Sequence, residues 1–554
     1  MTSSELIRPE DRYSAETIAE YRDGGFWPGG SLAASVDHWV DVQPDRLAMS
    51  DGYESLSWAQ LQGRAYRLAA KLKEMGIEPG DRVQMQLPSW NEYVVVYLAL
   101  ARIGGVLVPT MPIYRWDEVT YAINHAEAKI SVVCGTYRKF DYLGMVRDIR
   151  ENCPTLTQVI SVRVDEAGEG ETRFEDLIGA DGDPVPGSDV LGEPPSADAP
   201  HCIIYTSGTE SRPKGCYHTF NTVSYTVRSL GGDVMGLGPD DVMFMPSPIA
   251  HATGLAMGVT SPLVLGAGAH LMDTWEPLTG LDRIKEYGCT AAMAATPFVR
   301  MALDSFDPER HDISKMTRWV SAGAPIPESL LTDWQDKFPD CALLPVYGRS
   351  EGLLVTSCRT DDPNEKILNS DGKALPGVVL EIRGEDGKVV PTGEEGEICH
   401  GGPGLMLGYW RDPERTAEAI DDRGISRSGD LGKVDADGYM RVTGRIKDLI
   451  IRGGTNISAR EVEEHLLTHP KVANVALVGM PDRVLGERAC AFVVPKEGET
   501  PTFEELTTYL KVDRKIAVVK LPERLEILDE MPMTATGKIQ KFVLRDKLVA
   551  ESSD

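Results

Sequence analysis

The first half of the sequence alternates between segments that favour β-strands and segments that favour helices. Residues 82–87 predict a strand, residues 91–103 a helix, and residues 105–109 a second strand. Alternation of this kind is typical of parallel sheets that are covered by helices. We therefore expect an α/β fold whose large amino-terminal body is built from helix-covered parallel sheets.

The segment 205–215 reads Tyr-Thr-Ser-Gly-Thr-Glu-Ser-Arg-Pro-Lys-Gly and follows an apolar run that predicts a buried strand. Its glycines let backbone amides approach an anion closely, its hydroxyl groups donate hydrogen bonds, and Arg212 and Lys214 supply positive charge. A Walker-type loop does not fit, because Pro213 and Gly215 stand where that loop requires Gly and Ser or Thr. The segment predicts a phosphate-binding loop, with a hydroxyl-rich surface turn as the alternative.

The composition argues against several classes of partner. A formal net charge of −28 over 554 residues disfavours binding to nucleic acid or to an anionic membrane surface. The apolar stretches 93–108 and 251–271 are too interrupted to span a membrane, and residues 1–30 lack the apolar core of a secretory signal. Nine scattered cysteines without a C-x-x-C pair indicate reduced thiols, a cytoplasmic location and no zinc site.

The phosphate-binding loop resembles that of the acyl-adenylate-forming, or AMP-binding, enzymes, whose pattern is close to (S/T)-S-G-(S/T)-T-G-x-P-K-G. This family includes acyl- and aryl-CoA ligases, firefly-type luciferases and the adenylation domains of nonribosomal peptide synthesis. The sequence departs from the pattern at Glu210 and Ser211. A carboxylate beside a bound polyphosphate requires a compensating cation. The resemblance runs from about residue 45 to residue 541.

The resemblance implies two domains. Residues 1–445 would form the large domain, in which a β-barrel-like subdomain joins the parallel sheets. The acidic, Gly- and Pro-rich segment 165–200 is expected to be a surface excursion between its subdomains. Residues 446–554 have a compact α+β pattern and would form a small, mobile lid domain with its hinge at Lys447.

Residues 347–351, Tyr-Gly-Arg-Ser-Glu, resemble the family motif Y-G-x-T-E. The resemblance implies that Tyr347 stacks near adenine, that the Ser350 hydroxyl binds the α-phosphate and that Glu351 holds Mg²⁺. A single carboxylate suits this last role, because Mg²⁺ prefers one or two carboxylates together with phosphate oxygens and water. Read alone, the segment is equally compatible with a β-turn that carries a solvated Glu.

Four more residues match family positions. Asp430 matches the aspartate that binds both ribose hydroxyls, and Arg445 matches its partner. His251 matches a histidine between the acyl pocket and the path of the incoming thiol, and Lys538 matches the lysine that closes over the site for adenylation. Without the resemblance, each would be read as an ordinary turn, packing or surface residue.

The resemblance assigns the candidate residues to three groups. The catalytic group is Lys538, Glu351, Thr206 and His251. The group that binds the nucleotide or coenzyme is Thr206, Ser207, Gly208, Thr209, Lys214, Gly323, Ala324, Pro325, Tyr347, Gly348, Ser350, Asp430, Arg445 and Lys447. The group that lines the acyl pocket is His251, Ala322, Gly323, Ala324, Gly348 and Gly352.

These assignments imply an AMP-forming acid–thiol ligase that uses ATP, Mg²⁺ and coenzyme A. It would convert an aryl, alicyclic or medium-chain carboxylic acid into an acyl-AMP with release of pyrophosphate, and then into an acyl-CoA thioester. Two alternatives stay open. A carrier protein or a second enzyme could accept the acyl group, or Glu210 could have impaired catalysis and left an adenylate-binding protein. A homodimer is compatible with the sequence.

Overall fold

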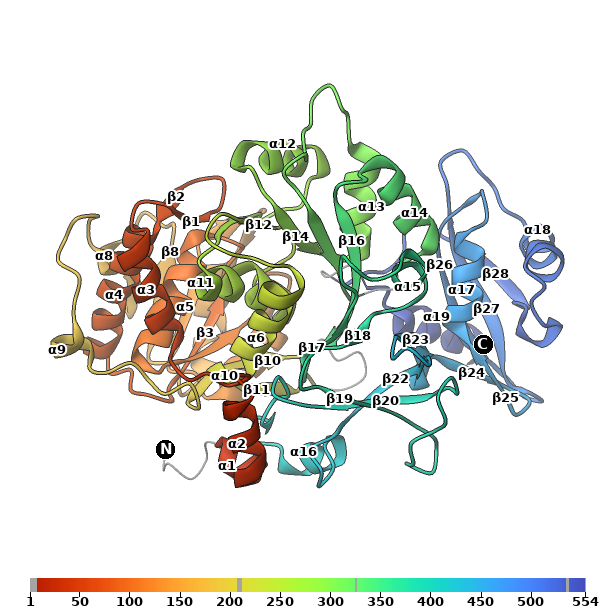
Figure 1. Ribbon diagram of the computed structural model, residues 1–554, viewed down its shortest axis with the longest axis horizontal. Helices are drawn as coiled ribbons and strands as arrows, with labels where there is room; N and C mark the ends of the chain where they lie inside the picture. Colours follow the sequence, from red (N-terminus) through yellow and green to blue (C-terminus); the bar gives the residue numbers. More distant parts are fainter. Residues whose placement is uncertain (1–6, 207–211, 324–325, 535–537, 554) are drawn as a thin grey trace.

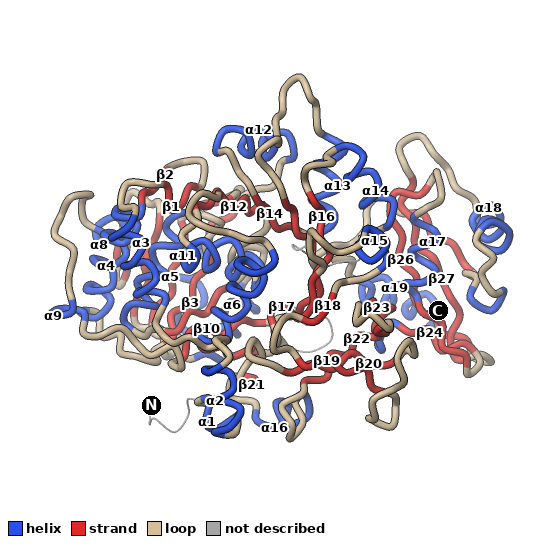
Figure 2. Tube along the Cα trace, viewed as in Figure 1, coloured by secondary structure: helices blue, strands red, loops and turns tan. Residues whose placement is uncertain are grey.

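The computed structural model describes residues 7–206, 212–323, 326–534 and 538–553 of the chain (Figure 1). Two large sheets form the amino-terminal body, a smaller antiparallel sheet follows, and a further sheet lies in the carboxyl-terminal part, coloured blue. Figure 2 shows strands in the interior with helices on the outside of the layers. The mixed α/β fold that the alternating pattern predicts is confirmed.

One sheet of the body has eight strands. These are β3 (Arg82–Gln86), β4 (Val106–Pro109), β5 (Ile130–Cys134), β8 (Gln158–Val162), β9 (Glu171–Arg173), β10 (Pro200–Tyr205), β11 (Gly215–Thr219) and β21 (Gly408–Tyr409). The order is β21-β11-β10-β4-β3-β5-β8-β9, and the strands from β10 to β9 run parallel. β11 and β21 are antiparallel. The loop between β10 and β11 is the predicted phosphate-binding loop.

The other large sheet has nine strands. These are β1 (Leu47–Ser50), β2 (Ser55–Ser57), β12 (Val242–Met245), β13 (Gly268–Leu271), β14 (Ala291–Ala294), β15 (Arg318–Ser321), β16 (Ala342–Arg349), β17 (Leu353–Ser357) and β18 (Lys373–Ala374). The order is β18-β17-β16-β15-β14-β12-β13-β1-β2, and the strands from β16 to β1 run parallel. Ligands of such sheets bind at the carboxyl ends of the strands.

Helices cover these sheets (Figure 1). They are α3 (Leu32–Val42), α4 (Trp58–Glu74), α5 (Asn91–Ile103), α6 (Trp116–Ala126), α7 (Tyr142–Ile149), α8 (Glu175–Ile178), α9 (Ser188–Leu191), α10 (Phe220–Thr226), α11 (Ser261–Leu265), α12 (Pro277–Tyr287), α13 (Thr296–Ser305), α14 (Glu328–Lys337), α15 (Asn364–Asn369) and α16 (Pro413–Ala419). α4 begins at a capping box, in which the Ser57 Oγ accepts from the Gln60 amide (3.3 Å) and the Gln60 side chain accepts from the Ser57 amide (2.9 Å).

The amino-terminal arm contains α1 (Pro9–Arg12) and α2 (Ala15–Asp23) and is fixed to the body by aromatic residues. Tyr13, Tyr21 and Trp27 pack edge to face with one another. The Tyr13 hydroxyl donates to the Leu405 carbonyl (3.2 Å), and the Trp27 indole N–H donates to the Pro403 carbonyl (3.0 Å). The arm therefore supports the segment that leads into β21.

The segment 165–200, most of which is exposed, contains β9, α8 and α9. β9 adds a parallel edge strand to the eight-stranded sheet, and α8 and α9 lie against α4. The Arg147 guanidinium holds both carboxylate oxygens of Glu171 at the start of β9 (2.6 and 2.8 Å). The Gly- and Pro-rich composition did not indicate this strand, because a three-residue edge strand needs little apolar pattern.

The remaining strands form two smaller sheets. A four-stranded antiparallel sheet lies where the barrel-like subdomain is expected, and it contains β19 (Val379–Arg383), β20 (Gly396–Gly401), β22 (Ser426–Val434) and β23 (Met440–Arg445). The carboxyl-terminal sheet contains β24 (Leu449–Arg452), β25 (Thr455–Ser458), β26 (Val472–Asp482), β27 (Gly486–Pro495) and β28 (Arg524–Ile527). It is accompanied by α17 (Ala459–Leu467), α18 (Phe503–Thr508) and α19 (Lys541–Ser553).

Two further features bear on the expectations from composition. None of the helices in the described part of the chain combines the length and the apolar character that crossing a bilayer requires. All nine cysteines are buried, free thiols.

A short hairpin of β6 (Thr136–Tyr137) and β7 (Phe140–Asp141) completes the set of strands.

Candidate active site

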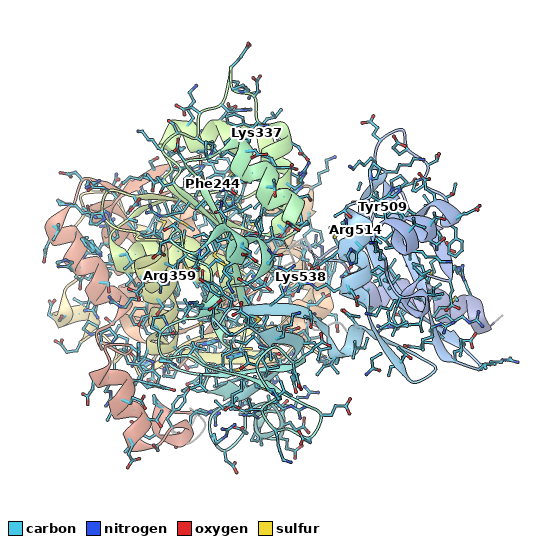
Figure 3. The ribbon with its side chains drawn as sticks, turned by 45° about the vertical axis from the view of Figure 1, so that its right-hand side comes forward. Phe244, Lys337, Arg359, Tyr509, Arg514 and Lys538 are labelled. Atoms are coloured by element: carbon cyan, nitrogen blue, oxygen red, sulfur yellow. The ribbon has the colours of Figure 1, made fainter. Side chains whose placement is uncertain are left out.

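A cavity of about 1590 Å³ lies where the two large sheets, the four-stranded sheet and the carboxyl-terminal part meet. Its wall includes Thr206 after β10, His251 after β12, Ala322 after β15 and Ser350 after β16. Figure 3 shows Lys538 at the junction between the body and the carboxyl-terminal part. The parallel strands thus direct their following segments into one cavity, as expected for this fold.

The two ends of the phosphate-binding loop lie in the cavity wall and are tied together. The Thr206 amide donates to the Lys214 carbonyl (2.9 Å), and the Lys214 amide donates to the Thr206 Oγ1 (3.3 Å). The Lys214 ammonium group lies 4.9 Å from the centroid of the Tyr409 ring, within range of a cation–π interaction. The predicted residues Ser207, Gly208 and Thr209, and the divergent Glu210 and Ser211, lie outside the described residues.

Glu351 is a buried carboxylate in the cavity wall, with 8% of its surface exposed. Its Oε1 accepts a hydrogen bond from the Tyr409 hydroxyl (2.8 Å) and lies 2.9 Å from the Arg349 Nη2. Burial raises the pKa of Glu351, but the charge of Arg349 and the Tyr409 hydrogen bond outweigh it and leave the pKa below its ordinary value. The carboxylate is therefore ionised at neutral pH.

Two buried histidines hold the turn that carries Glu351. The His218 Nε2 donates to the Ser350 carbonyl (2.8 Å), and the His400 ring lies against Gly352, where an added Cβ would come within 2.3 Å of it. Burial lowers the pKa of His218 to about 4 and that of His400 to about 3, so both rings are neutral. Because Gly352 faces His400, the structure does not bring this predicted pocket residue into the cavity wall.

Asp430 is engaged through both carboxylate oxygens. The Tyr347 hydroxyl donates to Oδ2 (2.7 Å), and the Arg445 Nε donates to Oδ1 (3.0 Å). Asp430 in β22 pairs directly with Arg445 in β23, so the strand register determines which arginine lies beside the carboxylate. The predicted set of Tyr347, Asp430 and Arg445 is thus brought together in one hydrogen-bonded group at the cavity wall.

Lys538 extends into the cavity from the carboxyl-terminal part (Figure 3). Its amide donates to the Thr534 Oγ1 (3.0 Å), and its carbonyl accepts from the Thr534 amide (2.7 Å). Its side-chain Cε lies 3.5 Å from the position that a Cβ on Gly323 would occupy. Burial and the charge of Arg445 lower the pKa of Lys538, while Asp430 and Glu351 oppose that effect.

The cavity wall that contains His251 also includes small and apolar residues, among them Ala252, Ala256, Ala322 and Leu354. Burial first and the charge of Lys538 second lower the pKa of His251 to about 4, so its ring is neutral at physiological pH. Small and apolar residues of this kind can pack against an apolar part of a ligand.

The cavity wall contains glycines that are required for different reasons. Gly348 is required by packing, because an added Cβ would lie 2.0 Å from the Leu353 carbonyl oxygen. Gly323 has a φ of +89°, which disfavours any side chain at that position. The predicted residues Ala324 and Pro325 lie outside the described residues. Lys447 lines the cavity, and its carbonyl accepts from the Arg545 Nη2 (3.3 Å) of α19.

The cavity wall also suits a metal ion for which phosphate oxygens supply some of the ligands. Among the described residues, no group of three or more His, Cys, Asp or Glu side chains could hold a metal ion. Glu351 is instead one ionised carboxylate in the wall of a cavity that can accommodate a nucleotide. Mg²⁺ is suited to such a site, because phosphate oxygens and water supply its other ligands.

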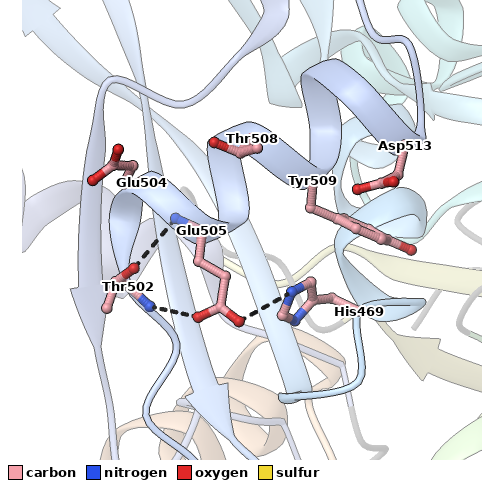
Figure 4. Close-up of a pocket in the computed structure, with 7 residues that line it drawn as sticks. All are labelled: His469, Thr502, Glu504, Glu505, Thr508, Tyr509 and Asp513. Atoms are coloured by element: carbon pink, nitrogen blue, oxygen red, sulfur yellow. Dashed lines mark hydrogen bonds and ion pairs between the residues drawn. The ribbon is translucent and has the colours of Figure 1, made fainter.

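A second hollow of about 440 Å³ lies on the carboxyl-terminal part (Figure 4). Among its acidic residues, Glu505 belongs to a capping box with Thr502 at the start of α18 (3.2 and 3.5 Å). The Glu505 carboxylate also pairs with Lys471 (2.9 Å) and lies 3.8 Å from His469. The Glu505 carboxylate is therefore already paired with groups of the protein.

Sequence reasoning did not assign a role to several residues around Glu351. Tyr409 is far from Glu351 in the sequence and reaches it only because β21 pairs with β11. Arg349 stands in the motif itself, two residues before Glu351, and its charge was a signal for a pair. His218 and His400 gave no local signal.

Models of two protein families match the chain. The AMP-binding enzyme model matches residues 36–410, and the model of the AMP-binding enzyme C-terminal domain matches residues 461–538. The chain is 34% identical to a medium-chain fatty-acid–CoA ligase of Escherichia coli K12, over 97% of this chain and 94% of the relative. It is 32% identical to a 2,3-dihydroxybenzoate-AMP ligase of Bacillus subtilis, over 96% of each chain.

Solved structures agree with this result. The anthranilate CoA ligase AuaEII in complex with anthranoyl-AMP matches with a TM-score of 0.84 and 25% identity, over 95% of this chain and 98% of that one. ATP-bound MatB from Rhodopseudomonas palustris matches with a TM-score of 0.83 and 30% identity, over 93% of this chain and 98% of that one. The chain therefore belongs to the AMP-binding enzyme family and is an adenylate-forming ligase.

Proposed function

We propose that this enzyme uses ATP to convert a carboxylic acid into an acyl-AMP and then transfers the acyl group to coenzyme A. The observation that carries the proposal is a single cavity that is lined by Lys214, Glu351, Asp430 and Lys538. These residues offer a cation for phosphates, a carboxylate for a metal, an acceptor for ribose hydroxyls and a second cation. Together they suit a nucleotide and a second anion.

The first reaction requires two anions to meet. A carboxylate oxygen of the acid attacks the α-phosphorus of ATP, the bond to the bridging oxygen breaks, and pyrophosphate leaves. The protein contributes positioning and charge neutralisation rather than covalent chemistry. Thr206 and Lys214, with Ser207 and Thr209 of the same loop, would bind the β- and γ-phosphates, and Asp430 would accept from the ribose hydroxyls.

Two positive charges would assist this step. Lys538 would lie between the substrate carboxylate and the α-phosphate, where it offsets repulsion as the two approach. Mg²⁺ bound by Glu351 and by phosphate oxygens would neutralise part of the phosphate charge. The short hydrogen bond from Tyr409 and the charge of Arg349 keep Glu351 ionised for this role. Tyr347 and Ser350 would contact the adenine ring and the α-phosphate.

The second reaction has different needs. The thiol sulfur of coenzyme A attacks the acyl carbon, and AMP leaves with the electrons of the bond to its phosphate oxygen. Lys538 fills part of the cavity in the described arrangement and has no evident use in this step. We propose that residues 446–554 move as a lid about a hinge at Lys447 between the two reactions.

Packing supports a boundary at this hinge. Each of the hydrophobic clusters among the described residues lies wholly on one side of it. The clusters of the body end at Val442, and those of the carboxyl-terminal part begin at Ile450. A motion about Lys447 would therefore break no shared hydrophobic core, which is the usual property of a domain boundary.

The proposed substrate is an aryl, alicyclic or medium-chain acid. The cavity wall includes the neutral His251 and small or apolar residues such as Ala252, Ala322 and Leu354, which leave room for a ring or an alkyl chain. The named relatives include ligases for a medium-chain fatty acid, for 2,3-dihydroxybenzoate and for anthranilate. Both observations support the same range of acids.

Pyrophosphate release from ATP tests this proposal. The enzyme is offered a panel of aryl, alicyclic and medium-chain acids with Mg²⁺, each with and without coenzyme A, and the acyl products are identified by mass spectrometry. The expected result is acid-dependent release and an acyl-CoA thioester. Accumulation of acyl-AMP in the presence of coenzyme A would instead favour a carrier protein or a second enzyme as the acceptor. Nucleotide binding without release for every acid would mean that the site does not catalyse adenylation.

A further inference from the structure

Arg349 is a charged cavity residue to which the proposed reaction gives no direct contact with the nucleotide. It follows Tyr347 and Gly348 at the end of β16 and precedes Ser350 and Glu351. Only 15% of its side-chain surface is exposed, and it lines the cavity. A buried arginine in a nucleotide-sized cavity requires either a structural or a functional explanation, because burying its charge is costly.

The guanidinium group of Arg349 connects two parts of the site. Its Nη2 lies 2.9 Å from the Glu351 Oε1. Its Nη1 donates to the Ser426 Oγ (3.2 Å) and to the Arg427 carbonyl (2.8 Å) at the start of β22. β22 also carries Asp430. Arg349 therefore contacts the carboxylate proposed to bind the metal and the start of the strand that carries Asp430, and all three residues line the same cavity.

The pairing of Arg349 with Glu351 would change when a metal binds to Glu351. Without a metal, Arg349 is the cation that pairs with the buried Glu351. A metal bound to Glu351 would have to share this carboxylate with the guanidinium. A fixed positive charge within a few ångströms of a phosphate is worth more than the same charge in water, because the cavity wall has a lower effective dielectric constant.

We propose that Arg349 is a counter-ion of the bound nucleotide that shares the carboxylate of Glu351 with the metal, and that it thereby makes ATP binding less dependent on Mg²⁺. The inference rests on the proposed function, since it assigns the α-phosphate to this part of the cavity. Arg349 keeps Glu351 in position before the metal is bound and supplies positive charge to the phosphates when little metal is present.

Isothermal titration calorimetry with ATP tests the inference. Binding is measured in EDTA and again in saturating Mg²⁺, for the wild type, Arg349→Met and Arg349→Lys. In EDTA, Arg349→Met is expected to weaken ATP binding at least about tenfold, because one cation near the phosphates is lost. In saturating Mg²⁺ the difference is expected to fall below about threefold, because Glu351 then binds the metal without competition. Arg349→Lys, which keeps the charge, should retain most of the binding in EDTA.

A matched control removes the same charge elsewhere. Arg423 is 61% exposed, pairs with Glu381 and does not line the cavity. Arg423→Met should therefore leave both affinities unchanged. If Arg349→Met does not fold, as judged by circular dichroism, Arg349→Gln retains hydrogen-bonding atoms without charge and is expected to give the same pattern.

The outcomes separate this inference from the proposed function. Equal losses in EDTA and in Mg²⁺, or no loss in either, would overturn the inference and leave Arg349 with a structural role only. If the wild type binds no ATP even in saturating Mg²⁺, the proposed function itself is wrong. A difference that is confined to EDTA supports the inference, because a structural role would not depend on the metal.

Discussion

Deleting a single oxygen atom, the Tyr409 hydroxyl, removes the hydrogen bond from Tyr409 to Glu351. Tyr409→Phe deletes the hydroxyl that donates to the Glu351 Oε1 over 2.8 Å and leaves the buried ring in place. A hydrogen bond to a charged group contributes about 1.5–3 kcal/mol. Since about 1.4 kcal/mol corresponds to one pH unit, the acidic limb of any activity that needs ionised Glu351 should move up by about one to two pH units.

The sign of the effect follows from the shifted pKa. In the folded protein the pKa of Glu351 lies below its ordinary value, so this group stabilises the fold above its unfolded pKa and loses that contribution as the pH falls through the folded pKa. Removing the Tyr409 hydroxyl raises the folded pKa. The variant should therefore be about 1.5–3 kcal/mol less stable at neutral pH and should lose less stability than the wild type on acidification.

The assay is acid-dependent ATP–pyrophosphate exchange between pH 5 and pH 8.5 in saturating Mg²⁺, with urea unfolding at pH 7 as the companion measurement. Tyr217→Phe is the matched control, because the Tyr217 ring is buried beside Trp410 and its hydroxyl has no hydrogen-bond partner among the described residues. The reasoning is refuted if Tyr409→Phe lowers the rate equally at every pH, or if Tyr217→Phe moves the acidic limb by the same amount.

Three further predictions follow from the site and the fold. Lys538→Ala should slow ATP–pyrophosphate exchange by about 100-fold or more and leave thioester formation from supplied acyl-AMP nearly unchanged, as measured by separate assays of the two reactions; equal losses would contradict the division of labour. Trp27→Ala should lower the free energy of unfolding by about 3–5 kcal/mol, because it empties a buried site and removes the bond to the Pro403 carbonyl, and guanidinium denaturation measures this loss. His270→Phe should make stability less dependent on pH between 6 and 4.5. Burial, and after it the charge of Arg283, lowers the pKa of His270 to about 3. Between pH 6 and 4.5 the unfolded chain therefore takes up a proton that the folded protein does not, and the free energy of unfolding falls by up to about 1.4 kcal/mol per pH unit. An unchanged slope in urea unfolding would show that this proton does not contribute.

The sequence predicted those features that depend on neighbours in the chain. α5 has the predicted bounds, and the capping box at Ser57 forms as the local pattern indicates. Candidate residues in the segments after strands, such as His251 after β12 and Ser350 after β16, reach the cavity because parallel strands carry these segments to the same edge. Roles that depend on pairing between distant segments were not predictable. Tyr409 reaches Glu351 through the register of β11 with β21, and no periodicity in either segment indicates that pairing.

The surroundings of two glycines were likewise not predictable from the sequence. The resemblance placed Gly348, within the Tyr-Gly-Arg-Ser-Glu motif, and Gly352, directly after it, together in the acyl pocket. In the structure, Gly348 is required by the Leu353 carbonyl and Gly352 by the His400 ring. A sequence shows that a side chain is absent, whereas only the fold shows whether a ligand or another part of the protein occupies that space.

The junction between the body and the carboxyl-terminal part indicates what would release the lid. Contacts across it include an ion pair between Arg441 and Glu464 (3.1 Å) and a hydrogen bond from the Ser458 hydroxyl to the Thr443 carbonyl (2.8 Å). Partly exposed pairs of this kind contribute about 0–1 kcal/mol each, so they hold the lid weakly. Lys538, in contrast, extends toward buried carboxylates, and on the proposed function it would also face the phosphates of ATP. Departure of pyrophosphate removes much of that negative charge, and so the first reaction itself would weaken the attraction that keeps Lys538 in the cavity and allow the lid to move for the second.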